Sequence, residues 1–265
     1  MGDDRYLLDN RSAGAGTRLD ALAAIFDPTT FRHIDALGIS TGWHCWEVGA
    51  GGPSVVRWLA QRVGPTGRVL ATDIDVSWTQ DGSGPGVEVR RHDVARDAAP
   101  AETFDLVHAR LVLVHVADRD EALRSMVRVL RPGGWLLVED ADPALQPLSC
   151  LDPHSPEEEL ANTLRTGFRA LMEQRGVDLA YGRKLPRLLR GAGLVDVAAD
   201  AYFPVARPEC ARLESTTMDL IRDDLVRHGI ATGAQIDRHV ASVAAGRLDL
   251  AQPPMISAWG RVPEA

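Results

Sequence analysis

The sequence has few cysteines and no long apolar segment, and both absences limit what the protein can be. Cys45, Cys150 and Cys210 are widely spaced and odd in number, without a CxxC pair or a Cys/His cluster at metal-ligand spacing. A disulfide framework and a metal site are therefore disfavoured, and a reducing compartment is expected. No apolar run reaches the roughly 18 residues of a membrane span. The acidic N-terminal sequence MGDDRYLLDN lacks the apolar region of a signal peptide, so we predict a cytoplasmic protein without a membrane partner.

Positive charge is also in short supply. The 265-residue chain has 29 Lys and Arg against 37 Asp and Glu, which gives a net charge of −8. An acidic surface repels a nucleic-acid backbone, so DNA and RNA are disfavoured as main partners. Hydrophobic residues make up 45% of the chain, enough for an ordinary globular core. The length suits one large α/β domain, or one such domain with a helical cap.

Strand and helix patterns alternate through residues 41–145. Strands are expected at 43–48, 68–73, 87–94, 104–109 and 135–140, with helices at 54–63 and 119–130. Repeated strand–helix–strand units of this length predict a doubly wound, Rossmann-like and mostly parallel sheet with helices on both faces. This segment is the expected ligand-binding core.

Helical patterns flank the expected core on both sides. Residues 1–40 predict an N-terminal lid of two helices, the first stopped by Asp27-Pro28. Within residues 146–265, helices are expected at 155–176, 183–193, 208–229 and 233–246, and strands at 194–205 and 253–262. This part would therefore supply cap helices, and C-terminal strands that complete the sheet, near the carboxyl edge where open α/β sheets bind ligands.

The first expected strand runs directly into a glycine turn, EVGAGGPSV at residues 47–55. Gly49 and Gly51 permit unusual backbone conformations and close approach of a ligand, and the following helix points free N–H groups at the same space. A glycine turn alone also occurs for purely structural reasons. The dinucleotide fingerprint needs a third glycine where Ser54 stands, which disfavours an NAD-dependent oxidoreductase. Pro53 lies near the first helical residue, where a missing N–H is tolerated.

Asp73 ends the second expected strand, 22 residues after Gly51. A carboxylate at this strand tip can accept hydrogen bonds from both hydroxyls of a ribose. Asp75 is the alternative, although its position favours a role in capping the next helix. The spacing and the strand position therefore favour Asp73 as a nucleoside-binding residue.

Several motifs in this order resemble the class I S-adenosylmethionine-dependent methyltransferases, specifically the bacterial small-molecule type. They cover roughly residues 43–140: EVGAG (47–51), ATD (71–73), HDV (92–94), FDLVHARLVLVHV (104–116) and VLRPGGWLLVED (129–140). The resemblance implies a seven-stranded sheet with an antiparallel last strand. It also implies an S-adenosylmethionine site along the carboxyl edge, with S-adenosylhomocysteine as the product.

The resemblance implies a role for each matching residue along that edge. The implied cofactor-binding residues are Glu47 beneath the turn, Gly49, Ala50 and Gly51 around the methionine part, Asp73 at the ribose, Ile74 beside the adenine, Asp93 and Val94 at the adenine edge, and His108 and Ala109 near the sulfonium. His108 has the alternative of a hydrogen-bonded structural histidine.

Methyl transfer asks the protein mainly to align an acceptor with an already reactive cofactor. A hydroxyl or amine acceptor can also need a base, and His115, six residues beyond the fourth strand, is the candidate. Its alternative is a polar residue that only shapes the pocket. Tyr6, Arg18 and Arg110 are candidates for closing the site or contacting the acceptor. Surface roles are the default for Tyr6 and Arg18, and His33 is also expected at the surface.

The sequence therefore predicts a methyltransferase for a small organic acceptor, with secondary metabolites as one candidate class. One alternative keeps S-adenosylmethionine but catalyses a non-methylating reaction such as rearrangement or cyclisation, because a fold does not define a function. An NAD-dependent oxidoreductase is a more remote alternative. The N-terminal helices could also mediate a homodimer.

Overall fold

The computed structural model describes residues 7–8 and 14–264, which form two compact units. The sheet unit comprises Phe26–Ala141, Tyr181–Tyr202 and Met255–Ala265. The helical unit comprises Met1–Ile25, Asp142–Ala180 and Phe203–Pro254. These units cut across the three predicted segments, because the second half of the first helix belongs with the sheet.

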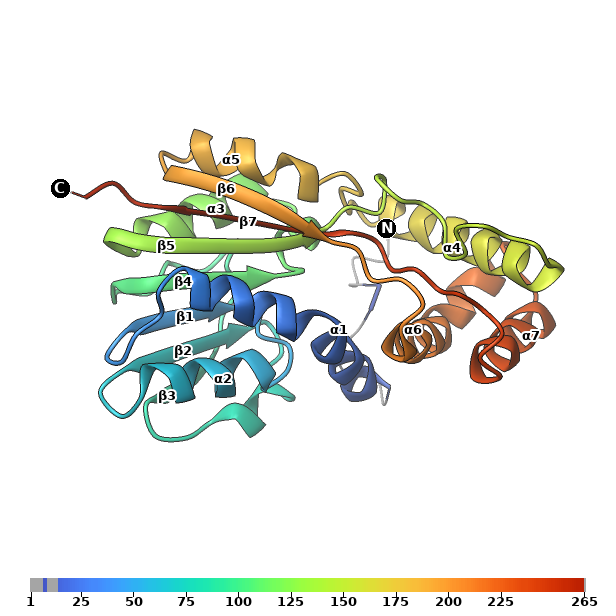
Figure 1. Cartoon of the computed structure of the whole chain (residues 1–265), viewed down its shortest axis with the longest axis horizontal. Helices are drawn as coiled ribbons and strands as arrows, with labels where there is room; N and C mark the ends of the chain where they lie inside the picture. The colour runs from blue at the N-terminus through green and yellow to red at the C-terminus, as the bar shows by residue number, and fades with distance from the viewer. Residues whose placement is uncertain (1–6, 9–13, 265) are drawn as a thin grey trace. The chain divides into compact units, whose positions relative to one another are not determined.

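The sheet unit is built around seven strands (Figure 1). They are β1 (His44–Val48), β2 (Arg68–Asp73), β3 (Val87–Arg91), β4 (Phe104–Arg110), β5 (Leu130–Ala141), β6 (Val195–Tyr202) and β7 (Met255–Arg261). Their order is β3-β2-β1-β4-β5-β7-β6, and β7 runs antiparallel to both of its neighbours while β1–β5 pair in parallel. The predicted Rossmann-like sheet with an antiparallel last strand is confirmed.

Alternation along the strands decides which face each helix covers. The buried side of α2 (Ser54–Val63) packs with Cys45 of β1, Leu106 of β4 and Leu137 of β5, and Ile34 of the first helix joins the same cluster. The remaining elements of this unit are α3 (Arg119–Arg128), α5 (Leu185–Gly191) and the 3₁₀ turns η1 (Thr79–Gly82), η2 (Leu113–His115) and η3 (Gly182–Lys184). The first helix and α2 therefore cover one face together.

A single helix, α1 (Ala15–Ala36), replaces the two helices predicted on either side of Pro28. A proline inside a helix removes one backbone hydrogen bond and crowds the preceding turn. The residues after Pro28 offset this cost by packing, because Thr30, His33 and Ile34 recur at helical spacing and are all buried. The predicted break was wrong because tertiary contacts outweighed the local signal.

Strand β5 also starts earlier than the sequence predicts. β5 begins at Leu130 rather than at 135, because RPGG forms an irregular part of the strand instead of a separate turn. The pairing of β5 with β4 shifts register between Phe104 and Leu106, and Gly133 has a φ of 76°. A glycine accommodates this bulge without the strain that a side chain would bring.

The helical unit contains α4 (Pro156–Gln174), α6 (Pro208–Arg227) and α7 (Gly233–Ala244), as predicted from amphipathic patterns. Their apolar faces meet in a core that includes Leu164, Leu171, Ile221, Leu225 and Ile236. The helix starts carry the side-chain caps that their sequences favour: Ser155 accepts from Glu158 N, and Thr232 forms a capping box with Gln235. Among the described residues, no helix combines the length and the apolarity of a membrane span.

Candidate active site

The glycine turn follows β1 directly and is tied to the end of β2. Gly49 and Gly51 have φ values of 63° and 60°, in the left-handed region that favours glycine. A Cβ on Gly49 would lie 2.3 Å from Cγ2 of Val112, so this position also needs the missing side chain. Ala50 N donates to Thr72 O (2.9 Å), and Gly51 N donates to Oδ2 of Asp73 (2.9 Å). The turn is therefore a fixed cradle of backbone.

Asp73 is mostly buried at the tip of β2. Its Oδ1 accepts from Asp75 N (2.9 Å), and its Oδ2 accepts from Gly51 N. Burial raises the pKa of this carboxyl, while the backbone donors act in the opposite direction. A carboxylate has about four acceptor sites, so two N–H groups leave capacity for ribose hydroxyls. Ile74 beside it is 54% exposed, an uncovered apolar side chain that suits the face of a base.

Asp93 follows β3, the neighbour of β2, and lies at the same edge of the sheet. Its Oδ1 accepts from Ala95 N (3.0 Å) and its own N–H donates to Oδ2 of Asp97 (2.8 Å), which orders the loop. Val94 is buried. His92 packs edge-on against Trp46 and contacts Ala98 O (3.0 Å), as expected for a packing residue.

His108 lies in a buried polar cluster between the sheet and α1. Its Nδ1 lies 2.6 Å from Oε2 of Glu47, and its Nε2 lies 3.3 Å from Oε2 of Glu139. Burial alone would lower the pKa of His108, but the two carboxylates outweigh it and raise the pKa to about 9. Burial alone would raise the pKa of Glu139, but the hydrogen bonds with His108 and His33 outweigh it and hold that pKa well below its usual range. The two carboxylates therefore favour the imidazolium form of His108.

Helix α1 completes this cluster from the other side. Nδ1 of His33 lies 3.1 Å from Oε1 of Glu139, and its Nε2 lies 2.9 Å from Oδ1 of Asp200 on β6. Ser257 of β7 donates to Oε1 of Glu139 (2.7 Å), and Thr30 donates to Oε2. The expectation that His33 lies at the surface was wrong, since it is only 3% exposed. Helical spacing alone does not show that the facing strands carry polar partners.

Arg110 contacts two residues of α1. Its NH2 nitrogen lies 2.8 Å from Oδ1 of Asp27, and its NH1 nitrogen donates to Thr30 (2.9 Å). Ala109 is buried in the sheet between β1 and β5. Arg18 is a buried residue of α1, and Tyr6 lies outside the described residues. The roles predicted for these four residues stay predictions.

His115 lies in η2, just beyond β4, and is half-buried. Arg119 anchors this turn, because its guanidinium donates to Leu113 O (3.0 Å) and Val114 O (3.3 Å). Asp140, fully buried at the end of neighbouring β5, was missed from the sequence. Burial raises the pKa of the Asp140 carboxyl well above its usual value, although the backbone N–H groups of η2 and the charge of Arg119 act in the opposite direction. A carboxyl with a perturbed pKa beside a turn that carries a histidine is typical of functional sites. The position of Asp140 at the end of a strand is the sequence feature that could have identified it.

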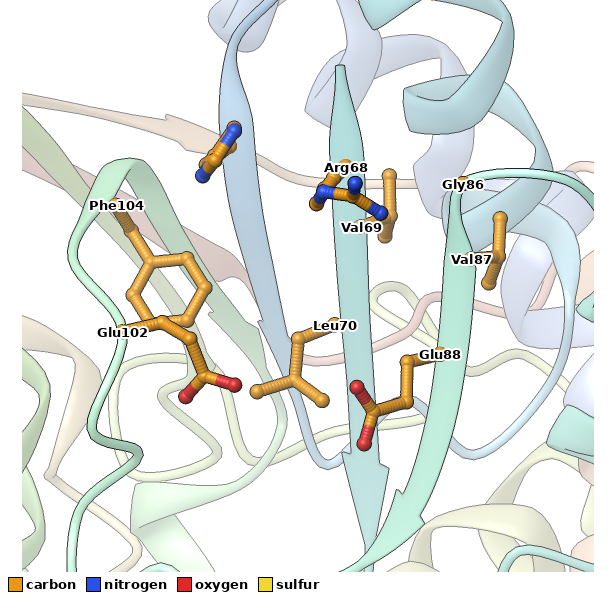
Figure 2. A pocket seen from close by; sticks show the side chains of 9 residues that line it. Arg68, Val69, Leu70, Gly86, Val87, Glu88, Glu102 and Phe104 are labelled. Atoms are coloured by element: carbon orange, nitrogen blue, oxygen red, sulfur yellow. The ribbon is translucent and has the colours of Figure 1, made fainter. Parts of the chain in front are cut away.

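The hollow shown in Figure 2 lies at the opposite, amino edge of the sheet. It measures about 170 Å³ and is lined by His44, Arg68, Val69, Leu70, Gly86, Val87, Glu88, Glu102 and Phe104. Arg90 pairs there with Glu88 (2.7 Å) and Glu102 (3.3 Å). Open α/β sheets bind ligands at the carboxyl ends of their strands. We therefore assign the site to the edge that carries the glycine turn.

Comparison with known proteins shows similarity to methyltransferases. Residues 46–138 match the family model described as a methyltransferase domain. A phosphoethanolamine N-methyltransferase of Triticum aestivum is 26% identical over 205 residues, 74% of this chain and 37% of that protein. The ubiquinone/menaquinone biosynthesis C-methyltransferase UbiE of Hahella chejuensis is 32% identical over 123 residues, 43% of this chain and 49% of that protein. The chain thus spans less than half the length of either relative.

A solved structure shows the same fold. Haemonchus contortus phosphoethanolamine N-methyltransferase 2, bound to phosphomonomethylethanolamine and S-adenosylhomocysteine, superimposes with a TM-score of 0.62 at 15% identity. The match covers 100% of this chain and 61% of that one. Residues 46–138 therefore resemble a methyltransferase domain, and the chain shares the fold of a solved methyltransferase.

The residues at the carboxyl edge fit the cofactor of this family. The absence of a side chain at Gly49 leaves the room that Cγ2 of Val112 occupies, and Gly49 and Gly51 hold the turn in the left-handed backbone region. Asp73 retains acceptor capacity for hydroxyls, and Ile74 exposes an apolar surface beside it. A ribose with an adenine on one side and an amino-acid chain on the other matches this arrangement of groups.

Proposed function

We propose that the protein transfers the methyl group of S-adenosylmethionine to a small organic acceptor. The hydrogen bond from Gly51 N to Asp73 carries this proposal, because it joins the methionine cradle and the ribose acceptor into one preformed site. The match of residues 46–138 to a methyltransferase domain supports it. The sheet order, with its antiparallel β7, supports it as well.

In this proposal the chain mainly binds and orients. Gly49, Ala50 and Gly51 wrap the methionine part, while Asp73 accepts hydrogen bonds from the ribose. Ile74 packs beside the adenine, and Asp93 with Val94 binds its edge. The cofactor supplies a methyl group that is already electrophilic. Alignment of an acceptor with that group can account for much of the rate enhancement.

His115 is the proposed base for an acceptor that must lose a proton. Its imidazole is the side chain whose ordinary pKa lies closest to neutral pH, which suits proton transfer. It lies on η2 at the end of β4, and Arg119 holds that turn in place. Asp140, at the end of β5, is the second titratable group of this region.

The acceptor is proposed to be a small molecule. The names of the two relatives refer to phosphoethanolamine and to ubiquinone or menaquinone biosynthesis, both small-molecule chemistry. The net charge of −8 disfavours a nucleic-acid acceptor. Three widely spaced cysteines support a reducing, cytoplasmic setting for the reaction. A homodimer through α1 stays part of the proposal.

Turnover on a panel of acceptors tests the function. The purified protein is incubated with S-adenosylmethionine and amines, phenols, quinols and carboxylic acids, and the products are detected by mass spectrometry. We expect S-adenosylhomocysteine to form only when the correct acceptor is present, together with a methylated product. Asp73→Ala, handled identically, controls for background hydrolysis of the cofactor.

Two outcomes contradict the proposal. Tight binding of S-adenosylmethionine without turnover of any acceptor favours a non-methylating reaction. Thermal stabilisation by NAD, with none by S-adenosylmethionine or S-adenosylhomocysteine, rejects the methyltransferase assignment altogether.

A further inference from the structure

A row of polar side chains, buried except for the partly exposed Asp200, crosses the sheet from β1 to β6 beneath α1. Glu47 of β1 is the register partner of His108 on β4, and Glu139 of β5 is the partner of Ser257 on β7. Ser257 in turn pairs with Asp200 on β6. His108 has Leu137 as its register partner on β5, and Glu139 lies two residues further along the same strand. Because strand residues in register share a face and alternate residues along a strand do too, these side chains lie on one face of the sheet, to which α1 adds Thr30 and His33.

Stability alone does not explain this row. Glu47, His108 and Glu139 are at most 2% exposed, and removing each charge from water costs several kcal/mol. Apolar residues of similar volume often stabilise a core as well or better than a buried ion pair does. The remainder of this face is apolar, as Cys45, Leu106 and Leu137 show. A buried charge row within such a core points to a role beyond packing.

One end of the row lies in the cofactor cradle. Glu47 precedes Gly49 by two residues, and His108 immediately precedes Ala109. Thr72 connects the same region, since its Oγ1 donates to Glu47 O (3.4 Å) while its own carbonyl accepts from Ala50 N (2.9 Å). Thr72 therefore ties the backbone of Glu47 to Ala50 in the glycine turn.

We propose that His108 is a positioning residue for the cofactor, which fixes the Glu47 carboxylate beneath the glycine turn. Glu139 holds the other ring nitrogen and is itself held by Thr30, Ser257 and His33. His108 acts through Glu47. The inference rests on the proposed function, because it assigns these residues to the S-adenosylmethionine site.

To hold Glu47 and Glu139 at the same time, the His108 ring needs a proton on each of its two nitrogens. An imidazolium donates from both nitrogens, whereas a neutral imidazole donates from only one and must release a carboxylate. The charged groups around the ring all influence whether it carries one proton or two. Glu47 faces it from β1 and Glu139 from β5, while Arg110 of β4 and His33 of α1 act on Glu139. Protonated His108 therefore holds two carboxylates that would otherwise repel each other.

Substitution His108→Gln tests the role. Glutamine can donate to one carboxylate but carries no charge, so Glu47 loses its fixed position. We expect the dissociation constant of S-adenosylhomocysteine, measured by calorimetry near neutral pH, to rise about 10- to 100-fold. The KM for S-adenosylmethionine should rise by a similar factor, while kcat at saturation changes by less than about threefold, because His108 does not align the acceptor.

His239→Gln is the matched control. His239 belongs to the helical unit, is 1% exposed, and its Nε2 lies 3.0 Å from Oε1 of Glu214. Both substitutions remove a buried His–Glu contact and should lower the melting temperature. Only His108→Gln should weaken binding of S-adenosylhomocysteine. If both variants fold and both bind S-adenosylhomocysteine within about twofold of the wild-type affinity, the inference is overturned.

A second measurement covers the case in which His108→Gln does not fold. With ¹⁵N-labelled histidine rings, the wild-type protein should show imidazolium signals that persist to about pH 8, because the pKa of His108 is raised to about 9. Addition of S-adenosylhomocysteine should shift one of these signals, and Glu139→Gln should move that same signal. If no persistent imidazolium signal responds to S-adenosylhomocysteine, the inference is wrong.

The two proposals fail in different ways. Wild-type protein that binds neither S-adenosylmethionine nor S-adenosylhomocysteine contradicts the proposed function itself. Wild-type binding that His108→Gln leaves unchanged contradicts only the positioning role.

Discussion

The backbone N–H of Gly51 donates a 2.9 Å hydrogen bond to Oδ2 of Asp73. The two residues are 22 positions apart and lie at the ends of neighbouring strands β1 and β2. Asp73 also accepts from Asp75 N through its other oxygen. The carboxylate thus orders the glycine turn on one side and the next loop on the other, and it presents its remaining acceptor sites at the edge of the sheet.

Substitution Asp73→Ala should weaken the binding of S-adenosylhomocysteine by about 1–3 kcal/mol, because the ribose hydroxyls lose a charged partner. The buried N–H of Gly51 also loses its acceptor, which loosens the cradle. Isothermal calorimetry measures the change directly. Asp75→Ala is the control, since its carboxylate accepts from Ser77 (3.0 Å). An Asp75→Ala loss as large as that of Asp73→Ala would contradict the assignment.

Substitution Gly49→Ala should disrupt the cradle in two ways. Its φ of 63° costs a residue with a side chain about 1–2 kcal/mol, and the new Cβ would lie 2.3 Å from Val112. Thermal unfolding and S-adenosylhomocysteine binding should both decline. Gly38→Ala is the matched control, because φ is 87° there and the space is open. We expect Gly49→Ala to lower stability more than Gly38→Ala does. The double substitution Gly49→Ala with Val112→Ala should recover part of the stability that Gly49→Ala loses.

Substitution His115→Ala should lower turnover by about 10²–10⁴-fold if His115 is the base. Affinity for S-adenosylhomocysteine should stay near the wild-type value, because the proposed role concerns the acceptor. Steady-state kinetics with the identified acceptor measures the first effect and calorimetry the second. His154→Ala, at a side chain that is 77% exposed, provides the control. A loss of turnover below about tenfold would leave His115 only a shaping role.

The buried row should make stability depend on pH. The pKa of His108 is raised from 6.5 to about 9 in the folded protein, and that of His33 is raised as well. Their contribution is therefore fully present below about pH 6.5 and is lost as pH rises through about 9. The pKa of Glu139 is lowered, so its contribution is present above about pH 4.5 and declines as pH falls further.

Melting temperatures of the wild-type protein between about pH 6 and 10 should consequently decline on the alkaline side. The decline should be smaller in His108→Gln, which lacks the titrating ring. A wild-type melting temperature that stays constant through this range would mean that His108 is not charged in the folded protein.

Much of the fold and the cofactor edge could be predicted because the signals are local. The turn from Gly49 to Gly51 and Asp73 at the next strand tip follow from short spacings and from strand periodicity. The missed features include the continuity of α1 through Pro28 and the burial of His33. Both depend on which residues of distant strands face the helix, and a single segment does not contain that information.

Local sequence is enough to predict the alternation of strands and helices, the glycine turn and the acidic strand tip, since each depends on neighbours along the chain. The meeting of Glu47, His108 and Glu139 depends on the tertiary fold, because the sheet order places β4 between β1 and β5. Burial and mutual attraction then set the charge of His108, and neither is a property of its own segment. The same assembly pairs Arg110 of β4 with Asp27 of α1, two residues that lie far apart in the sequence.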